Sequence, residues 1–157
     1  MKKYKVYLDT SVISHLYQLD APEKMAETKV LWEKFKNDEF DIYLSDVTLE
    51  EVNACREDKK EILSKYLNEI KFTKLELNDD AFDIADKIIE MGILKNKSRD
   101  DANHIGIAVV NDCDYIISWN FKHMVNVKTV NGVRAITNLS GYKSIDLVAP
   151  NYFLEED

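Results

Sequence analysis

The chain has 157 residues, a length that predicts one domain, residues 1–157, with room for a sizeable hydrophobic core. Hydrophobic residues make up 45% of the sequence, with only 4 Gly and 2 Pro, which excludes collagen-like, low-complexity and disordered proteins. The formal net charge of -8 argues against a protein that coats DNA through a dense Lys and Arg surface. Any contact with nucleic acid is therefore expected to be local or assisted by a metal ion.

The apolar stretches, such as 105–110, are far shorter than the ~20 residues that a membrane-spanning helix needs. The N-terminal sequence MKKYKVYLDTSV is interrupted by Asp9 and lacks the features of a secretory signal. We therefore expect no membrane contact and a cytoplasmic location. Cys55 and Cys113 fit no CxxC metal motif and are too few for a disulfide framework, so ordinary buried thiols are expected.

The first part of the chain alternates strand and helix patterns. Residues 4–8 are β-branched and aromatic and predict a strand, which the turn residues 9–11 stop. Apolar residues at helical spacing predict a helix over 23–35. The segment DIYLS at 41–45 then predicts a second strand.

Helical patterns dominate the middle of the chain. Thr48 is expected to cap the helix after the second strand, with Glu51 three residues later. A further apolar helical face runs over 62–70. A helix is expected over 79–91, and Gly92 is suited to end it in the left-handed conformation. The apolar stripe of this last helix comprises Phe82, Ala85, Ile88 and Ile89.

Three more strands are expected after residue 71. The alternating segment 72–77, the apolar segment DYIIS at 114–118 and the segment 144–148 have strand patterns. Between the first two of these lie a basic loop, 95–99, and a helix that runs to about residue 111. Ser98 is expected to cap this helix.

The dipeptide Asn131-Gly132 would ordinarily indicate a β-hairpin, but its neighbours do not alternate. Val133 and Ile136 instead fit a helix that ends at Gly141, and we favour this helix. The acidic end, 155–157, is expected to fray. Strands that alternate with helices predict an α/β fold with right-handed βαβ units and a central parallel sheet covered on both faces.

Polar residues follow the expected strands at one edge of this sheet, where functional groups collect in such folds. Asp9 ends the first strand, Glu51 lies in the helix after the second, Asp101 opens the helix over 98–111, and Asn120 follows the strand at 114–118. Each carboxylate alone also fits a helix cap or a first helical turn. Converging carboxylates, however, repel one another unless a cation joins them. Oxygen ligands without Cys or paired His select Mg²⁺ or Mn²⁺.

The segments YLDTSVIS, SDVTLEEV, RDDANHIGIA and DYIISWNFKHM resemble the PIN-domain family, which includes VapC-type toxins. The resemblance covers nearly the whole chain. It implies a Rossmann-like three-layer α/β/α domain that cleaves RNA, with Asp9, Glu51 and Asp101 as ligands of Mg²⁺ or Mn²⁺. It also implies products with 5′-phosphate and 3′-hydroxyl ends, an antitoxin protein as the partner of a toxin, and a homodimer.

Asn120 departs from this family pattern, because many members have Asp at the corresponding position after a Thr/Ser-x pair. Asn supplies a carbonyl oxygen but no charge, so Asn120 is a candidate to orient water or substrate, and a second ion would be held weakly. The alternative is that Asn120 only caps the short segment after the strand.

Two histidines and two hydroxyls are further candidates. His104 lies one turn beyond Asp101 and either faces the site or packs in the core. His123 is expected either to contact substrate or to support its loop. Thr10 and Ser11 either donate hydrogen bonds to Asp9 or phosphate or serve only as caps.

Several cations and large apolar residues are also candidates for contacts with RNA or a partner. The basic side chains expected to attract RNA phosphates, although a solvated face is the usual role of a single lysine, are Lys95, Lys97, Arg99 and Lys122. Trp32 and Phe35 are expected to lie in the core or to form an apolar patch for a partner.

The leading hypothesis is a metal-dependent endoribonuclease that uses Asp9, Glu51 and Asp101. The alternative is a PIN-like module that binds RNA or protein without efficient cleavage. A phosphatase with Asp9 as nucleophile is disfavoured, because the D-x-D motif of haloacid-dehalogenase-like enzymes would need Asp where Ser11 stands. Loss of cleavage in an Asp9→Asn variant would separate the first hypothesis from the second.

Overall fold

The computed structural model describes residues 2–154, so the predicted fraying at 155–157 lies outside the described residues. Five parallel strands form one sheet in the order β3-β2-β1-β4-β5. The strands are β1 (Lys5–Leu8), β2 (Asp41–Ser45), β3 (Thr73–Leu75), β4 (Tyr115–Ile117) and β5 (Asp146–Val148). The predicted α/β class and the central parallel sheet are confirmed.

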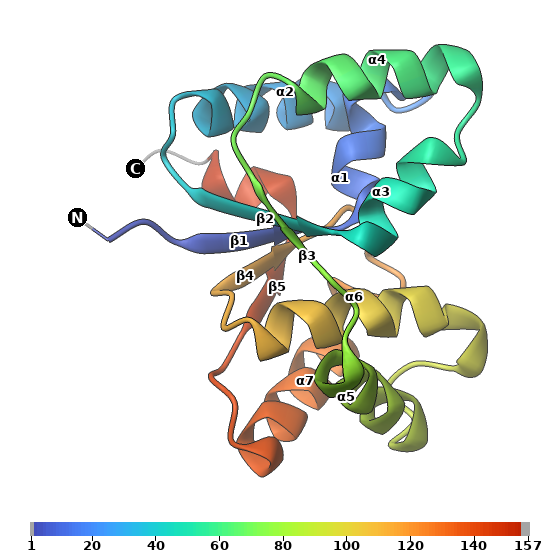
Figure 1. The fold of residues 1–157 in the computed structure, drawn as a ribbon, viewed down its shortest axis with the longest axis vertical. Helices are drawn as coiled ribbons and strands as arrows, with labels where there is room; N and C mark the ends of the chain where they lie inside the picture. Colours follow the sequence, from blue (N-terminus) through green and yellow to red (C-terminus); the bar gives the residue numbers. More distant parts are fainter. Residues whose placement is uncertain (1, 155–157) are drawn as a thin grey trace.

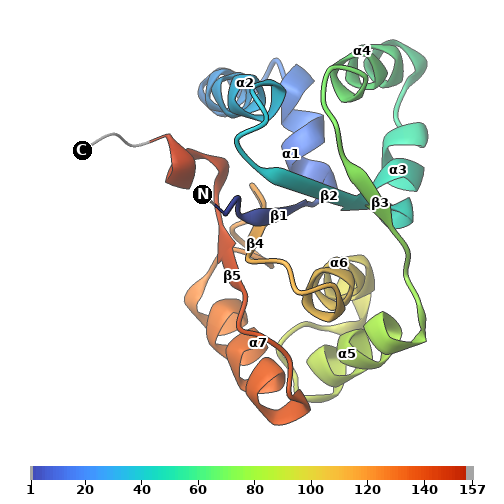
Figure 2. The same cartoon turned by 60° about the vertical axis from the view of Figure 1, so that its left-hand side comes forward.

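Helices cover both faces of the sheet and complete a three-layer α/β/α arrangement (Figures 1 and 2). One layer holds α1 (Thr10–Ser14), η1 (His15–Tyr17), α2 (Pro22–Lys36), α3 (Asp46–Asn53), α4 (Glu57–Leu67) and η3 (Pro150–Phe153). The other holds α5 (Asp79–Glu90), η2 (Asn96–Ser98), α6 (Arg99–Val110) and α7 (Val127–Ser140). No helix within residues 2–154 is long and apolar enough to span a membrane.

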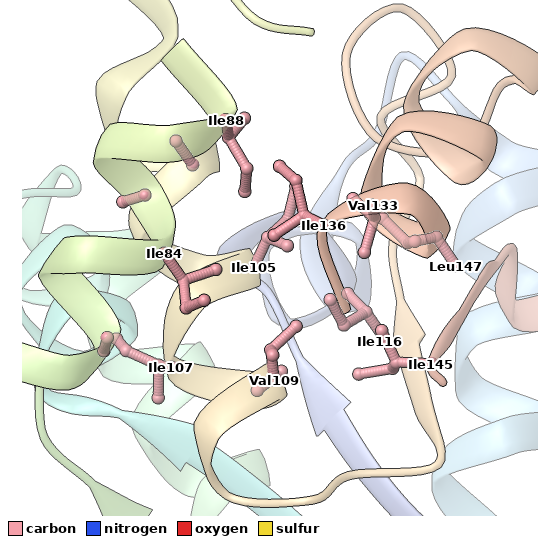
Figure 3. Packing of buried hydrophobic residues seen from close by; sticks show 14 of the residues in the cluster. Ile84, Ile88, Ile105, Ile107, Val109, Ile116, Val133, Ile136, Ile145 and Leu147 are labelled. Atoms are coloured by element: carbon pink, nitrogen blue, oxygen red, sulfur yellow. The ribbon is translucent and has the colours of Figure 1, made fainter. Parts of the chain in front are cut away.

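Neighbouring residues of the central strand face opposite layers. Val6 and Leu8 belong to the core beneath α1 to α4, whereas Tyr7 belongs to the core beneath α5 to α7. Figure 3 shows the second core, in which Ile84 of α5 and Ile136 of α7 lie around the sheet residue Ile116. Because both faces are buried, the inner strands β1, β2 and β4 contain nearly continuous apolar runs rather than an alternation.

The order of the strands creates a switch point between β1 and β4. The chain runs outward from β1 through β2 to β3, and then crosses back beyond β1 to reach β4 and β5. Connections therefore leave β1 and β4 on opposite sides, which opens a crevice at their carboxyl ends. The residues that follow these two strands begin with Asp9 and Ser118.

Several strand and helix boundaries agree with those predicted from the sequence. The strand predicted at 41–45 has those bounds in the structure. Gly92 has φ 73° and Gly141 has φ 78°, so both glycines adopt the left-handed conformation expected after a helix. The segment around Asn131-Gly132 lies inside α7, which confirms the helix and excludes the hairpin.

The caps predicted at Thr48 and Ser98 need correction. Ser45, not Thr48, caps α3, because Ser45 Oγ accepts a hydrogen bond from the Thr48 backbone N at 3.3 Å. Glu51 therefore lies in the second turn of α3 rather than at its N-terminus. Ser98 occupies the N-cap position of α6 but makes no side-chain cap hydrogen bond.

The large apolar side chains of α2 lie in the core. Trp32 is 1% and Phe35 2% exposed, and Trp32 Nε1 donates a hydrogen bond to the Tyr66 carbonyl at 3.1 Å. Of the two expectations for these residues, the core position is therefore confirmed and the apolar partner surface is excluded. Cys113 is buried as expected, whereas Cys55 is only partly buried, and both are free thiols.

Candidate acidic site and the neighbouring lysine groove

A pocket of about 270 Å³ lies at the carboxyl ends of β1 and β4, where the topology places its switch point. We call it the acidic pocket, and its lining residues are Asp9, Thr10, Ser11, Ser14, Glu51, Asp101, His104 and Asn120. The fold thus brings the four main site residues of the sequence analysis together, although they lie up to 111 positions apart in the chain.

Asp9 is the most enclosed carboxylate of the pocket, with only 3% of the residue exposed. Its Oδ1 accepts hydrogen bonds from Ser11 Oγ at 2.6 Å and from the Val12 backbone N at 3.4 Å. Its Oδ2 accepts from Ser118 Oγ at 2.5 Å. Burial raises the pKa of Asp9, and the charge of His104 and these hydrogen bonds offset only part of that rise.

The two serines that hold Asp9 also join the ends of β1 and β4. Ser11 Oγ accepts a hydrogen bond from the Trp119 backbone N at 2.9 Å. Ser118 Oγ accepts from the Asn120 backbone N, also at 2.9 Å. Asp9 is therefore fixed by a network that includes both strands of the switch point, and its role as the α1 cap is part of the same geometry.

Glu51 is held by a buried histidine. His104 Nε2 lies 2.9 Å from Glu51 Oε1, and an ionised carboxylate can only accept, so the ring carries a proton on Nε2. On its other side, His104 Nδ1 lies 2.6 Å from the Tyr7 hydroxyl, which lies 2.7 Å from Ser45 Oγ. Burial alone would raise the pKa of Glu51, but the hydrogen bond and the charge of His104 outweigh it and lower that pKa.

Within residues 2–154 no such hydrogen bond holds Asp101, and the charges of Asp9 and Glu51 act on its carboxylate. Burial is the main reason that its pKa is raised, and the charge of Asp9 adds to the rise. The charges of His104 and His123 act in the opposite direction. The pocket is therefore short of positive charge, as expected for a site that attracts a cation.

The side chain of Asn120 has a structural role within its own loop. Its Oδ1 accepts a hydrogen bond from the His123 backbone N at 3.0 Å, the cap that the sequence analysis gave as an alternative. Asn120 also lines the acidic pocket, so the cap and a contact with water or substrate are compatible. His123 lines the neighbouring groove instead.

The donor chemistry of the pocket fits a hard divalent ion, because carboxylate, amide and hydroxyl oxygens surround it. Thr10 Oγ1 is a buried oxygen in this lining that makes no well-formed hydrogen bond within residues 2–154. In that part of the chain, no three His, Cys, Asp or Glu side chains stand ready as a metal-ligand set. Asp9 and Glu51 are instead engaged by Ser11, Ser118 and His104.

A second hollow of about 310 Å³ lies beside the acidic pocket and has no acidic residue in its lining. We call it the lysine groove, and its charged lining residues are Lys95, Lys97, Lys122 and Lys128. Three of the predicted phosphate-binding cations are thus brought together. Arg99 is not among them, because it pairs with Asp86 at 2.6 Å and lies over the Phe82 ring.

Sequence reasoning missed the residues that support the site from a distance. Tyr7 and Lys128 carried no motif of their own, although a tyrosine in a buried strand must place its hydroxyl on a polar partner. That rule was the available signal for Tyr7. Lys128 lies in the first turn of α7, where nothing in the local sequence points to the groove.

The fold has a solved counterpart. A chain in the crystal structure of VapBC2 from Rickettsia felis, bound to a DNA fragment from their promoter, is similar to this chain with a TM-score of 0.54. The match covers 92% of this chain and 98% of that chain at 12% sequence identity. No protein-family model matches the sequence, and a search of curated proteins gives no match. At this identity the likeness shows the fold alone, and activity must be argued from the site.

Proposed function

We propose that this chain is a metal-dependent endoribonuclease of the PIN type. The observation that carries the proposal is that Asp9, Glu51 and Asp101 line one pocket at the switch point of a PIN-like fold. Ligand sites in open α/β sheets lie at such points. The raised pKa values of Asp9 and Asp101 add an electrostatic reason for this pocket to take up a cation.

The three carboxylates would hold Mg²⁺ or Mn²⁺, with Asp9 as the rigid member because three donors fix it. A divalent ion, when bound, supplies Lewis-acid activation of water and neutralises charge at the phosphate. His104 keeps Glu51 at the pocket wall. Because Oδ1 of Asn120 is occupied by the His123 backbone N, the amide Nδ2 is the atom of Asn120 available to donate to water or phosphate.

Cleavage of a labelled RNA with purified protein tests this function. Wild type should cleave in Mn²⁺ and not in EDTA, and should leave 5′-phosphate and 3′-hydroxyl ends. Asp9→Asn and Asp101→Asn should each abolish cleavage, whereas Asp100→Asn, on the exposed side of the same helical turn, should cleave as wild type does. Equal cleavage by wild type and Asp9→Asn would assign the activity to a contaminant and refute the proposal.

A non-cleaving module that binds RNA or protein is the second candidate. Asn120 favours it, because this residue removes one negative charge relative to the family pattern that the sequence resembles. Such a module would bind RNA with the same affinity in Mn²⁺ and in EDTA and would leave it intact. Cleavage that depends on Asp9 excludes this reading.

The partner proteins are proposed from the resemblance of the sequence motifs to VapC-type toxins and from the likeness in fold to a chain of VapBC2. We propose an antitoxin as a partner and a homodimer as the assembled form. Growth arrest on expression of this chain alone, relieved by a gene adjacent to its own and absent for Asp9→Asn, would support the toxin role. Light scattering of the purified chain measures its oligomeric state.

A further inference from the structure

The lysine groove gathers positive charge on a protein that is acidic as a whole. Four lysines line it, while the formal net charge of the chain is -8. All four are exposed, and within residues 2–154 none of them has a carboxylate oxygen within the 4.0 Å of an ion pair. What distinguishes these four lysines is that they line one hollow whose lining residues include no Asp or Glu, so their positive charges add and are available to a ligand.

Hydrogen bonds with side chains fix the backbone of the segment 121–123, which lines the groove. Asn126 Nδ2 donates hydrogen bonds to the carbonyls of Phe121 and Lys122, at 3.1 and 3.0 Å. Thr129 Oγ1 donates to the His123 carbonyl at 2.8 Å, and Asn120 accepts from the His123 backbone N. The segment 121–123 therefore presents its side chains from a fixed backbone, which lowers the ordering cost of binding.

Phe121 is an aromatic ring that remains 46% exposed in this fixed segment. The Trp119 ring packs against it at a centroid distance of 6.2 Å with an interplanar angle of 70°, and Lys24 Nζ lies 5.3 Å from its centroid. These neighbours hold the ring at the groove, where it is part of the lining. An exposed aromatic beside unpaired cations is the combination that binds stacked bases and their phosphates.

The groove continues directly from the acidic pocket. Asn120 lines the acidic pocket, and the next three residues, Phe121, Lys122 and His123, line the groove. The groove volume, about 310 Å³, is at the small end of ligand pockets, which suits one nucleotide rather than a folded partner. A strand that places one phosphate at the carboxylates can thus lay its neighbouring nucleotide in the groove.

We propose that the lysine groove is a subsite for one unpaired nucleotide of the RNA, whose base stacks on Phe121 while the flanking phosphates pair with the lysines. This subsite rests on the proposed function and adds to it a position beside the cut where the RNA must be unpaired. Bases in a duplex are already stacked and paired and cannot present a face to the ring. If the groove bound an acidic protein instead of RNA, the lysines would contribute to binding but stacking on Phe121 would not.

RNA binding in EDTA tests the subsite apart from cleavage. The probes are a short fluorescent single-stranded RNA, the same strand annealed to its complement, and polyglutamate of equal charge, with fluorescence anisotropy as the readout. Phe121→Ala should weaken single-strand binding about five-fold or more, and Phe121→Tyr should restore it. Phe82→Ala is the matched control, because Phe82 is 45% exposed and lies outside the groove. Duplex binding should not respond to Phe121→Ala.

The lysines are tested by salt dependence. The variant Lys95→Ala/Lys97→Ala should reduce the slope of log affinity against log salt by about 0.7 for each lysine. Lys29→Ala/Lys65→Ala, which removes two exposed lysines on α2 and α4, should leave the slope unchanged. Circular dichroism of each variant checks that it is folded.

The outcomes separate the subsite from the proposed function. Wild-type affinity of Phe121→Ala for the single strand, an unchanged salt slope in the lysine variant, no RNA binding at all, or equal affinity for polyglutamate would each overturn the subsite. Binding that depends on Phe121, without any cleavage in Mn²⁺, would leave the subsite standing and refute the nuclease. Cleavage that depends on Asp9 but not on Phe121 would support the nuclease and refute the subsite.

Discussion

His104 Nε2 lies 2.9 Å from Glu51 Oε1 and so joins α6 to α3 across 53 positions of the chain. The histidine side chain is 3% exposed and that of Glu51 is 38% exposed, so the contact connects the core to the pocket wall. Because Tyr7 contacts the other ring nitrogen, the orientation of the imidazole is fixed from both sides. This arrangement makes His104 a positioning residue for Glu51.

A double-mutant cycle on His104→Ala and Glu51→Ala measures this contact. We expect a coupling of about 1 kcal/mol in urea unfolding, below the usual range of about 1.5–3 kcal/mol for a hydrogen bond to a charged group because Glu51 is partly solvated. His104→Ala alone should cost about 1–3 kcal/mol, since it leaves Tyr7 with one partner fewer. The control cycle pairs His104→Ala with Glu50→Ala, the exposed neighbour, and should show no coupling. Equal coupling in the two cycles would contradict the positioning role.

Removal of the Asp101 charge is expected to stabilise the metal-free protein at neutral pH. Burial and the charge of Asp9 raise the pKa of Asp101, so the folded state binds this proton more tightly than the unfolded state. The associated stability is present in acid and is lost as the pH rises through the raised pKa. Asp101→Asn should therefore have a higher melting temperature than wild type at neutral pH in EDTA, and the difference should shrink in acid.

Asp100→Asn is the matched control for this measurement, because Asp100 is exposed and adjacent in the same helical turn. Its melting temperature should follow that of wild type at every pH. A lower melting temperature for Asp101→Asn than for wild type at neutral pH would show that the carboxylate is stabilised in the fold. The pocket would then lack the excess of negative charge that we ascribe to it.

The candidate carboxylates could be found from the sequence because strand ends and motif spacing are local properties. Asp9 directly follows a strand, and Asp101 lies in the first turn of a helix. The contacts that tune them are not local. Tyr7 and His104 are 97 positions apart, and Ser118 and Asp9 are 109 apart, so no window of sequence contains both partners. Only the tertiary structure brings these partners together.

The error in the stripe of α5 has a similar cause. Helical spacing predicted that Phe82 faces inward, but Phe82 is 45% exposed and Ile84 is buried instead. Periodicity gives the repeat of a helix but not which side meets its neighbour. In α5 the buried side includes Ala81 and Ala85, because both lie against Gly106 of α6 at close range. The small residue that decides the packing lies on another helix.

Gly106→Ala is expected to destabilise the protein by about 1–3 kcal/mol or more in urea unfolding. A Cβ at this position would overlap the backbone carbonyl of Ala81, which cannot move without shifting α5. Gly132→Ala is a useful comparison, since its Cβ would come within 2.5 Å of the Ile93 side chain only, and a side chain can adjust. A smaller loss for Gly106→Ala than for Gly132→Ala would contradict the close packing of α5 on α6.

Asn120→Asp tests the position at which this chain departs from the PIN-domain pattern. Aspartate keeps an oxygen that can accept from the His123 backbone N, so the fold should be retained. It also adds a negative charge to the lining that already contains Asp9 and Asp101. If these groups hold a divalent ion, Asn120→Asp should raise both Mn²⁺ affinity and the cleavage rate, most clearly at low Mn²⁺.

Isothermal titration and cleavage against Mn²⁺ concentration measure these two effects of Asn120→Asp. Superimposable curves for wild type and Asn120→Asp, with only a shifted melting temperature, would reduce Asn120 to a cap of its loop.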